Sequence, residues 1–288
     1  MRFVRFQSSD QSQGLAVITK DGLRGLASTE ANFPGYLEQL LALPAAELAA
    51  AGQLLATRGH PIDGATLLPP LMAPPKLICI GLNYRDHSAE SGFVPPDYPT
   101  VFARYASSLI GDGAALVRPK VSTQFDYEGE LAVVIGRGGR HISMEAALDH
   151  VAGYSVFNDG SIRDYQRRTP QWTIGKTFDG TGAFGPAFVT ADELPPGCRG
   201  LRLRTRLNGV VMQDALIDDM IFDVATLVSL MSEAMTLQPG DIIVSGTPAG
   251  VGVARQPPVF LKPGDICEVE IDHVGLLRNP VVDESSLP

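Results

Sequence analysis

The hydrophobic positions beyond residue 76 gather in short runs bounded by glycine and proline, a pattern typical of β-strands. The predicted strands are 77–80, 131–135, 201–207, 242–244 and 267–271. One stretch, 221–235, has helical spacing instead, and its candidates for a buried face are Phe222, Ala225, Val228, Leu230 and Met231. Widely spaced strands with few helices between them predict a β-rich α+β fold rather than a doubly wound sheet.

The first 70 residues have a pattern of their own. Their predicted elements are short strands at 3–6 and 15–18 and helical turns over 32–57. The proline-rich segment 68–75 is predicted to be a stiff linker. We therefore predict a small N-terminal α/β domain over residues 1–70 and a larger domain over residues 71–288.

The composition is that of a globular protein with a sizeable core, with 288 residues of which 44% are hydrophobic and 19% charged. No apolar run approaches the roughly 20 residues that span a bilayer, and the first residues show no secretory signal pattern. We therefore expect a cytoplasmic protein with no membrane partner. The three cysteines lie far apart and form no C-x-x-C pair, so neither a disulfide framework nor a zinc knuckle is predicted.

The formal net charge is −9, from 23 Lys and Arg against 32 Asp and Glu. No basic run is present, which argues against nucleic acid as a partner. The chain also has no G-x-G-x-x-G at a strand–helix junction and no P-loop, so nucleotide cofactors are not expected. An acidic protein that binds an acidic metabolite needs a metal ion or local cations to reverse the potential at the site.

Acidic residues stand at the start of the predicted core strand 131–135. Asp126, Glu128 and Glu130 are two apart, so an extended chain would project them from one face. Like charges this close repel one another unless a cation or protons intervene. A solvated strand edge is the alternative, favoured by roughly three to one for an isolated E-x-E. Continuity with a core strand shifts that balance toward a bound cation.

A further acid, Asp159, follows the predicted strand 151–157. An Asp before Gly is usually only a turn former, yet strand ends carry site residues more often than other positions. Together with Glu128 and Glu130 it would supply three hard oxygen ligands, which suit Mg²⁺ or Mn²⁺. Asp126 is expected to support these ligands from behind.

His87 and Glu90 are three residues apart just after the strand 77–80. One helical turn would place them side by side, and the carboxylate would orient the imidazole and raise its basicity. An exposed helix pair is roughly five times commoner than a catalytic dyad with this spacing. The position after a strand end, with the flexible pair Ser91-Gly92 beyond it, favours the catalytic interpretation.

Candidate cationic and anion-binding groups lie further along the chain. Lys176 stands between apolar residues and glycines, where a salt-bridged surface lysine is an equally good interpretation. Arg163 follows Asp159, with the polar Gln166 close by. In the segment 245–252, backbone N–H groups and the Thr247 hydroxyl could hold a carboxylate, although a structural glycine-rich turn is about as common.

Five of these segments together resemble the fumarylacetoacetate hydrolase (FAH) family. The matching segments are 81–90, 127–136, 157–159, 175–179 and 245–252. They occur in the family's order, and the resemblance covers roughly residues 72–282. Each motif is modest, whereas five in register are highly specific.

The resemblance implies a mixed β-sandwich roll, usually a homodimer, that binds Mg²⁺ or Mn²⁺ through Glu128, Glu130 and Asp159. It implies that His87 and Glu90 sit on a mobile lid that orders over bound substrate. The residue matching Lys176 would lie near the metal-bound oxygens. The positions that it assigns to substrate contacts are Arg85, Arg163, Gln166, Gln213 and Thr247.

The chain departs from the family pattern at one position. Many members have Phe-x-Lys ahead of a serine pair, whereas this chain has Phe102-Ala103-Arg104 followed by Ser107-Ser108. Arginine keeps the charge and offers a longer, forked donor. The resemblance therefore does not carry a specific substrate with it.

The resulting hypothesis is a metal-dependent hydrolase that cleaves a carbon–carbon bond in a small 2,4-dioxo acid of the acylpyruvate or fumarylpyruvate type, giving pyruvate and a carboxylic acid. A small anionic 2-oxo acid would bind the metal, Lys176 would stabilise the enolate, and His87 would activate water. Decarboxylation of an oxaloacetate-like acid is an alternative on the same site, as are isomerase, hydratase and sugar-acid activities. A non-catalytic scaffold is a remote further alternative.

Overall fold

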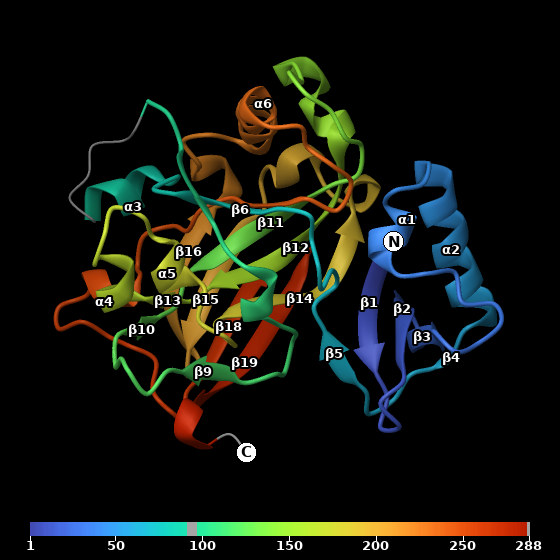
Figure 1. Cartoon of the computed structure of the whole chain (residues 1–288), viewed down its shortest axis with the longest axis horizontal. Helices are drawn as coiled ribbons and strands as arrows, with labels where there is room; N and C mark the ends of the chain where they lie inside the picture. The colour runs from blue at the N-terminus through green and yellow to red at the C-terminus, as the bar shows by residue number, and fades with distance from the viewer. Residues whose placement is uncertain (91–96, 287–288) are drawn as a thin grey trace.

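The computed structural model describes residues 1–90 and 97–286, apart from the side chains of residues 88 and 89. Two β-sheets face each other in the larger body of the molecule, and residues 1–70 form a smaller unit at one side of it (Figure 1). No helix in the described ranges is long and apolar enough to cross a membrane. The β-rich α+β organisation predicted from the hydrophobic pattern is confirmed.

The larger sheet contains twelve strands within the described residues. Its order is β4 (His60–Pro61), β3 (Gly22–Ala27), β2 (Gln13–Thr19), β1 (Arg2–Gln7), β14 (Gly182–Thr190), β12 (Val151–Asp159), β11 (Gly129–Ile135), β17 (Ile242–Val244), β6 (Leu77–Gly81) and β7 (Thr100–Ala103), with β5 (Thr66–Leu68) on β1 and β8 (Leu109–Ile110) on β14. Neighbouring strands are antiparallel except for the pairs β17–β6 and β14–β8.

The second sheet covers one face of the first. Its order is β16 (Val210–Leu216), β15 (Arg202–Leu207), β18 (Ile266–Ile271), β19 (Gly275–Asp283) and β9 (Leu116–Arg118). A separate pair, β10 (Phe125–Asp126) and β13 (Ser161–Ile162), lies at the end of β11 and β12. Strands β15, β18 and β19 pack on β11, β12 and β14, so the two sheets form a sandwich.

Strand β11 shows why its sequence is apolar at every position from 131 onward. Leu131, Val133 and Ile135 point into the core shared with the second sheet. Ala132 and Val134 point into a second core on the opposite face, which also contains side chains from residues 1–70. Because both faces of the strand are buried, the alternation of polar and apolar residues seen in half-exposed strands is absent.

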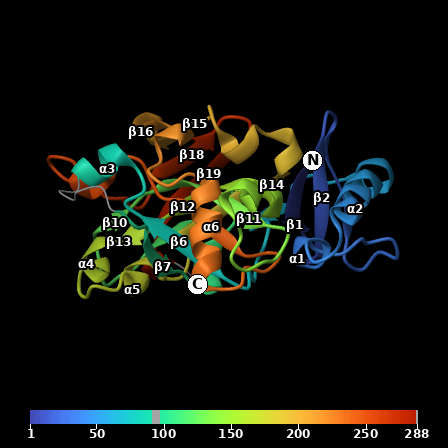
Figure 2. The same cartoon turned by 90° about the horizontal axis from the view of Figure 1, so that it is seen from above.

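The helices are short and lie outside the sheets. They are α1 (Leu37–Leu40), α2 (Ala45–Arg58), α3 (Arg85–Glu90), α4 (Arg163–Gln166), α5 (Thr173–Lys176) and α6 (Val224–Ala234). Seen from above, α3, α4 and α5 gather at one end of the molecule, and α1 and α2 lie at the other (Figure 2). The segment predicted to have helical turns over 32–57 contains two helices because Pro44 starts the second one.

Helix α6 begins where the side chain of Asp223 accepts a hydrogen bond from Thr226 N at 2.9 Å. The apolar spacing predicts this helix correctly, but the predicted face needs correction. Its buried side chains are Val224, Leu227, Val228, Met231 and Ser232. Ala225 and Leu230 are only partly buried, because they flank this stripe.

The unit formed by residues 1–70 continues the larger sheet. Strand β1 pairs antiparallel with β14, with Arg2 opposite Val189 and Phe3 opposite Phe188. Phe3 and Leu15 are fully buried in the core that also contains Phe188. The smaller unit therefore shares backbone hydrogen bonds and a core with the larger one. Division into separate domains at residue 70 stays a prediction.

Candidate functional site

Two neighbouring strands bring three acids together at one end of the larger sheet. Glu130 lies opposite Phe157 in the β11–β12 ladder, and Asp159 N donates to Glu128 O at 2.8 Å. Residues two apart share a face of a strand, so Glu128, Glu130 and Asp159 project from the same side. Their carboxylate oxygens lie within 4.8 Å of one another, and the residues are only 5%, 2% and 0% exposed. We call Glu128, Glu130 and Asp159 the acid cluster.

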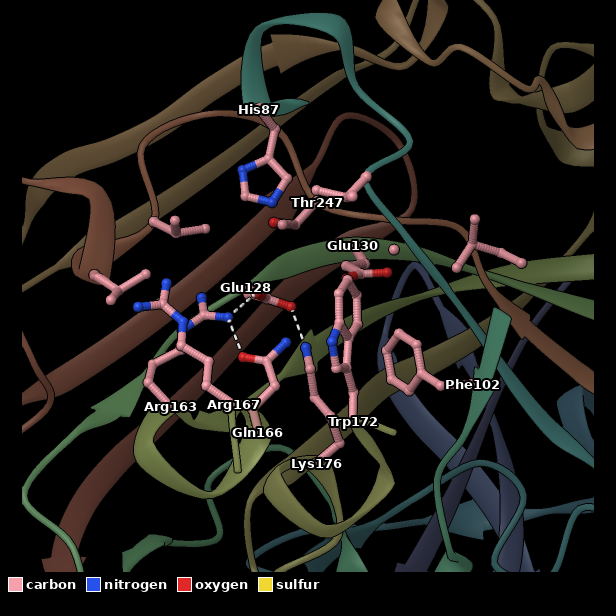
Figure 3. A pocket seen from close by; sticks show the side chains of 15 residues that line it. His87, Phe102, Glu128, Glu130, Arg163, Gln166, Arg167, Trp172, Lys176 and Thr247 are labelled. Carbon is pink, nitrogen blue, oxygen red and sulfur yellow. Dashed lines mark hydrogen bonds and ion pairs between the residues drawn. The ribbon is translucent and has the colours of Figure 1, made fainter. Parts of the chain in front are cut away.

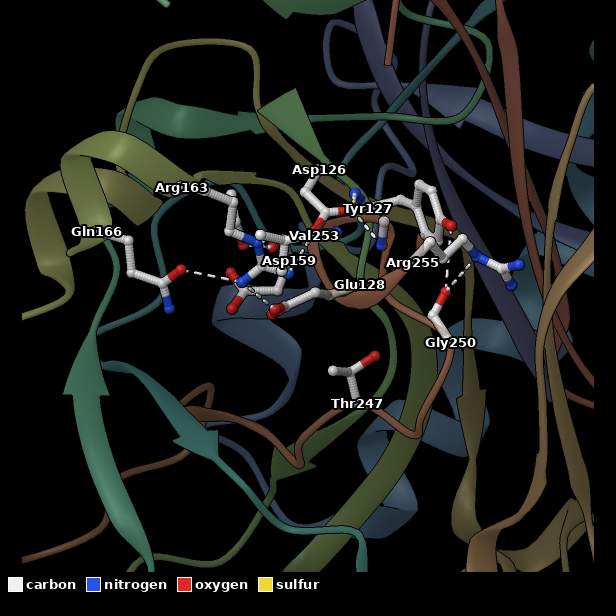
Figure 4. Close-up of polar contacts among 12 residues, drawn as sticks. Asp126, Tyr127, Glu128, Asp159, Arg163, Gln166, Thr247, Gly250, Val253 and Arg255 are labelled. Atoms are coloured by element: carbon white, nitrogen blue, oxygen red, sulfur yellow. Dashed lines mark hydrogen bonds and ion pairs between the residues drawn. The ribbon is translucent and has the colours of Figure 1, made fainter. Parts of the chain in front are cut away.

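Asp126 stands beside the acid cluster without belonging to it. The strand that carries it, β10, ends at Asp126, and β11 begins at Gly129, so the predicted single row of three acids is interrupted. Its carboxylate accepts hydrogen bonds from Gly252 N at 2.8 Å, Val253 N at 2.9 Å and Arg163 Nε at 2.8 Å (Figure 4). Asp126 thereby anchors Arg163, which contacts the acid cluster.

Three buried cations surround the acid cluster. Lys176 Nζ contacts Glu128 and lies 2.6 Å from Asp159 Oδ2. Arg163 Nη1 lies 2.7 Å from Glu128 Oε1, and Arg104 Nη1 lies 2.5 Å from Asp159 Oδ1. Glu128 and Asp159 are thus each paired with Lys176 and with one arginine, which offsets the cost of burying their charges.

Lys176 reaches the acid cluster because α4 and α5 pack unusually close together. A Cβ atom on Gly175 would lie 2.3 Å from Gln166 N, nearer than real Cβ atoms come to backbone. Only glycine allows this approach. The Gly-Lys pair in the sequence is therefore a packing requirement as well as a source of charge.

The charges of the neighbours divide the acid cluster into two kinds of carboxylate. Burial alone would raise the pKa of Glu128, but the Arg163 and Lys176 charges lower it to about 2. Burial also opposes ionisation of Lys176, yet the charges of Asp159 and Glu128 hold its pKa above the ordinary lysine value. Glu128 is therefore a carboxylate and Lys176 an ammonium at neutral pH.

Glu130 is the acid whose charge is not compensated. Burial, followed by the charges of Asp159 and Glu128, raises the pKa of Glu130 well above its usual range. Its carboxylate accepts a hydrogen bond from Gly246 N at 2.6 Å, and no lysine or arginine of the described residues forms an ion pair with it. Three converging carboxylates with one uncompensated charge fit a divalent cation, and the all-oxygen donor set suits Mg²⁺ or Mn²⁺.

Arg104, which departs from the family pattern, holds Asp159 in place. Its guanidinium also donates to Ser108 Oγ at 2.9 Å, Thr181 Oγ1 at 2.6 Å and Gly160 O at 3.2 Å. A lysine ammonium at the end of a single stem could not reach all four acceptors, because they are spread around a planar fork. Four acceptors therefore fix the guanidinium, and one of them is the candidate metal ligand Asp159.

The predicted dyad is present at the other side of the site. His87 Nδ1 and Glu90 Oε1 lie 2.9 Å apart in α3, and His87 is only 7% exposed. A carboxylate accepts protons, so Nδ1 carries the hydrogen and Nε2 is left as a base. Figure 3 shows the imidazole reaching toward Glu128 and Thr247. The predicted flexible pair Ser91-Gly92 lies outside the described residues.

The glycine-rich segment 245–252 binds the protein's own acids. Gly246 N donates to Glu130, and Gly250 N donates to both carboxylate oxygens of Glu90 at 3.0 Å. The sequence indicates that backbone N–H groups of this segment could hold a carboxylate. In the structure, two of these N–H groups hold carboxylates of the protein itself, those of Glu130 and Glu90.

Two predicted substrate contacts also have partners within the protein. Gln213 Nε2 donates to Thr247 Oγ1 and to Pro248 O, each at 2.8 Å, and its Oε1 accepts from Gly129 N at 2.9 Å. The Thr247 hydroxyl donates to Gly129 O at 2.9 Å. Gln213 therefore ties the glycine-rich segment to β11 and does not line the pocket, whereas Thr247 lines it with its hydroxyl proton already donated.

A small pocket of about 120 Å³ opens over the acid cluster. It is lined by Ile80, Gly81, Leu82, His87, Phe102, Glu128, Glu130, Arg163, Gln166, Arg167, Trp172, Lys176, Thr247, Val251 and Val253 (Figure 3). The exposed Arg85 lines a different hollow, beside Asp214 and Asp218, and its substrate contact stays a prediction. Glu128, Glu130, His87 and Lys176 line the pocket, whereas Asp159 and Glu90 contact these lining residues from outside it.

A sequence profile described as Fumarylacetoacetate (FAA) hydrolase C-terminal matches residues 76–282. The chain belongs to the fumarylacetoacetate hydrolase family. The oxaloacetate tautomerase fahd2, mitochondrial, of Xenopus laevis is 40% identical over 289 residues, which cover 98% of this chain and 90% of the relative. The human oxaloacetate tautomerase FAHD2A, mitochondrial, is 39% identical, with 98% of this chain and 92% of the relative covered.

Solved structures of the family agree with the fold over nearly the whole chain. The fumarylacetoacetate hydrolase (EaFAH) from Exiguobacterium antarcticum has a TM-score of 0.84 at 33% identity, covering 99% of this chain and 100% of that one. The 5-carboxymethyl-2-hydroxymuconate delta-isomerase from Mycobacterium smegmatis has a TM-score of 0.76 at 32% identity, covering 99% of each chain. The predicted FAH-type sandwich roll is confirmed.

Sequence reasoning missed residues at the pocket wall. Trp172 packs its ring against Phe102 with centroids 5.5 Å apart, and together they form an apolar side of the pocket. Arg167 is a further lining residue, exposed at the end of α4. The only available signal was its position one residue after Gln166, and two adjacent arginines are more often a solvated surface than a binding site.

Proposed function

We propose that this member of the FAH family is a divalent-metal-dependent tautomerase that interconverts the enol and keto forms of a small 2-oxo dicarboxylic acid such as oxaloacetate. The observation that carries the proposal is that one small pocket is lined by Glu128 and Glu130 of the acid cluster, the oriented base His87 and the ammonium of Lys176. Two relatives that cover nearly the whole chain are named oxaloacetate tautomerases, which supports this choice among the reactions of the family.

Residues Glu128, Glu130 and Asp159 would hold the metal. When bound, Mg²⁺ or Mn²⁺ would supply Lewis acidity and hold the oxygens of a 2-oxo acid. His87 Nε2 would take the proton from the enol oxygen and return a proton to the other carbon of the enol double bond, which balances the isomerisation without water or a second substrate. Lys176 stabilises the negative charge that develops on that oxygen.

The buried surroundings assist this proton transfer. Glu90 holds the imidazole in one tautomer, and Gly250 N holds Glu90 through both of its oxygens. Phe102 and Trp172 exclude water from the opposite side of the pocket. A proton taken by His87 is therefore transferred back to substrate more readily than to solvent.

A second candidate is hydrolysis of a carbon–carbon bond in a 2,4-dioxo acid of the acylpyruvate type. The observation that favours it is again the dyad, since His87 oriented by Glu90 can deprotonate a water that attacks the distal carbonyl. The bond then breaks to give pyruvate enolate and a carboxylic acid. A similar solved structure is named a fumarylacetoacetate hydrolase, and this name supports hydrolysis as the second candidate.

The test is a product analysis of the full chain with Mg²⁺, with Mn²⁺ and after exhaustive chelation. Enol oxaloacetate should disappear faster with metal than without it, with no release of CO₂ or pyruvate beyond the background. Pyruvate and acid from an acylpyruvate would identify the hydrolase instead, and CO₂ from oxaloacetate a decarboxylase. Full activity in chelator would reject the metal-dependent mechanism altogether.

Assembly and location remain separate proposals. We propose a homodimer, as the family resemblance implies, and light scattering of the purified chain would test it. The predicted cytoplasmic location competes with the word mitochondrial in the names of both tautomerase relatives. Localisation of a tagged full-length protein would decide between the two.

A further inference from the structure

Arg167 differs from the other cations of the pocket because its side chain has no partner. Among the residues that the structure describes, Arg163 and Lys176 are each paired with carboxylates, whereas the exposed guanidinium of Arg167 forms no hydrogen bond or ion pair. Its neighbour Arg168 stacks on the Tyr165 ring at 3.6 Å from the centroid. Arg167 is therefore a cation directed at the pocket with its charge available.

The position of Arg167 in α4 explains why it faces the pocket. Arg167 N donates to Arg163 O at 3.1 Å, so the two residues are one helical turn apart and share a face. Figure 3 shows the two guanidinium groups near each other, away from Trp172 and Phe102. Arg163 extends into the buried part of the pocket and contacts Glu128, whereas Arg167 lies at its solvent-exposed part. We call these two parts the inner end and the outer end of the pocket.

The charges at the inner end suffice for one substrate carboxylate and no more. The buried acids are Asp126, Glu128, Glu130 and Asp159, and the buried cations are Arg104, Arg163 and Lys176. With all of them ionised these seven groups carry a net charge of −1, and a divalent cation changes it to +1. One carboxylate of a 2-oxo acid neutralises that charge. A second carboxylate therefore requires a further cation.

Of the described residues that line the pocket, Arg167 is the one lysine or arginine that is not already paired with a carboxylate. Val251 and Val253 also line the pocket, and their apolar side chains cannot stabilise an anion. In oxaloacetate two carbon atoms separate the carboxylates, so a molecule with one carboxylate at the acid cluster presents the other to a different part of the pocket wall.

We propose that Arg167 binds the second carboxylate of the substrate and makes the pocket selective for 2-oxo dicarboxylic acids over 2-oxo monocarboxylic acids. This inference rests on the proposed function for the orientation of the substrate, with its 2-oxo acid end at the acid cluster. Arg167 is then a specificity-determining residue, because it contacts the part of the substrate that does not react.

The test compares Arg167→Met with the matched control Arg168→Met. Both substitutions remove one positive charge from adjacent exposed positions, but only the first changes the pocket. For oxaloacetate tautomerisation with Mg²⁺, Arg167→Met should raise KM by about 10- to 30-fold with little change in kcat, the usual effect of losing one partly exposed ion pair. Arg168→Met should leave both constants at the values of the unmodified chain.

A binding measurement separates this inference from the proposed function. Calorimetry with Mg²⁺ should show tighter binding of oxaloacetate than of 2-oxobutanoate, which lacks the second carboxylate, and Arg167→Met should abolish the difference while leaving 2-oxobutanoate unaffected. If this binding difference were found in a chain that does not tautomerise oxaloacetate, the proposed reaction would be rejected, but the role of Arg167 in binding the second carboxylate would stand. Equal losses for both ligands, or no loss for either, would overturn the role of Arg167 even in an active tautomerase.

Discussion

The inner and outer ends of the pocket are built in opposite ways. At the inner end Arg104, Arg163 and Lys176 are buried and paired with carboxylates, and backbone N–H groups hold the remaining acids. At the outer end Arg167 is exposed and unpaired within the described residues, and the dyad stands on a helix of six residues. The protein itself pairs the cations of the inner end, whereas Arg167 at the outer end would gain a charge partner from a ligand.

This difference predicts how substitutions divide. Changes at the inner end should alter folding stability and activity together, because each buried charge is part of a connected set. Changes at the outer end should alter activity alone, since exposed side chains contribute little to stability.

The largest effects are expected within the acid cluster, where two acids should behave differently. Asp159→Asn and Glu130→Gln should each reduce metal-dependent turnover by about a thousandfold, the equivalent of several kcal/mol of lost charge stabilisation. Asp159→Asn should also lower the free energy of unfolding by about 2–4 kcal/mol, because Arg104 and Lys176 lose a buried counter-charge.

Glu130→Gln should leave the metal-free protein at least as stable as the unmodified chain, because it removes a charge that two neighbouring acids repel. Thermal unfolding in chelator and Mn²⁺ binding measure the two effects separately. Equal destabilisation by both substitutions would show that Glu130 has a stabilising partner in the folded protein.

His87→Ala should reduce kcat by about 100- to 1,000-fold, the range typical of a lost general base. The metal affinity should not change, because His87 is not part of the acid cluster. Glu90→Gln should reduce kcat by a smaller factor than His87→Ala, since an amide oxygen can still orient the imidazole ring. Loss of Mn²⁺ binding in His87→Ala would instead assign the histidine to the metal.

Arg104→Lys should weaken metal binding by about 10- to 100-fold, as expected when a group that orients a ligand is changed. The lysine keeps the charge beside Asp159 but loses contacts to Ser108, Thr181 and Gly160. Mn²⁺ titration gives the affinity, and the unfolding midpoint should fall as well. An unchanged affinity would mean that charge alone positions Asp159.

Thr247→Val should have the smallest effect on catalysis. The substitution keeps the shape and removes hydrogen bonds to Gly129 and Gln213, so stability should fall by about 1–2 kcal/mol. KM should change by less than about threefold, since the hydroxyl proton already has an acceptor. A tenfold increase in KM would instead support the substrate contact that the family resemblance assigns to Thr247.

Much of the fold could be predicted from local pattern. Core strands such as β11 and β17 could be predicted because short apolar runs bounded by glycine and proline are typical of buried strands. The acid cluster was also visible, because spacing by two residues places Glu128 and Glu130 on one face and strand ends meet at one edge of a sheet. His87 and Glu90 followed from helical spacing in the same way.

Other features depend on residues that are far apart in the sequence. The glycine-rich segment 245–252 has N–H groups suited to any carboxylate, and only the fold presents Glu130 and Glu90 to them. Gln213 and Arg85 were assigned by resemblance, and tertiary packing turned one inward to β11 and the other to a separate hollow. Arg104 was seen only as a departure from a pattern.

By itself the sequence determined which segments form strands, which acids and bases share a face, and which family the motifs resemble, because these depend on spacings of two to four residues. The tertiary structure decided which charges of the pocket neutralise one another, and that the Arg167 side chain has no partner among the described residues. Pairing of these charges requires contact in space between residues 17 to 55 positions apart in the sequence. Local periodicity carries no information about such contacts.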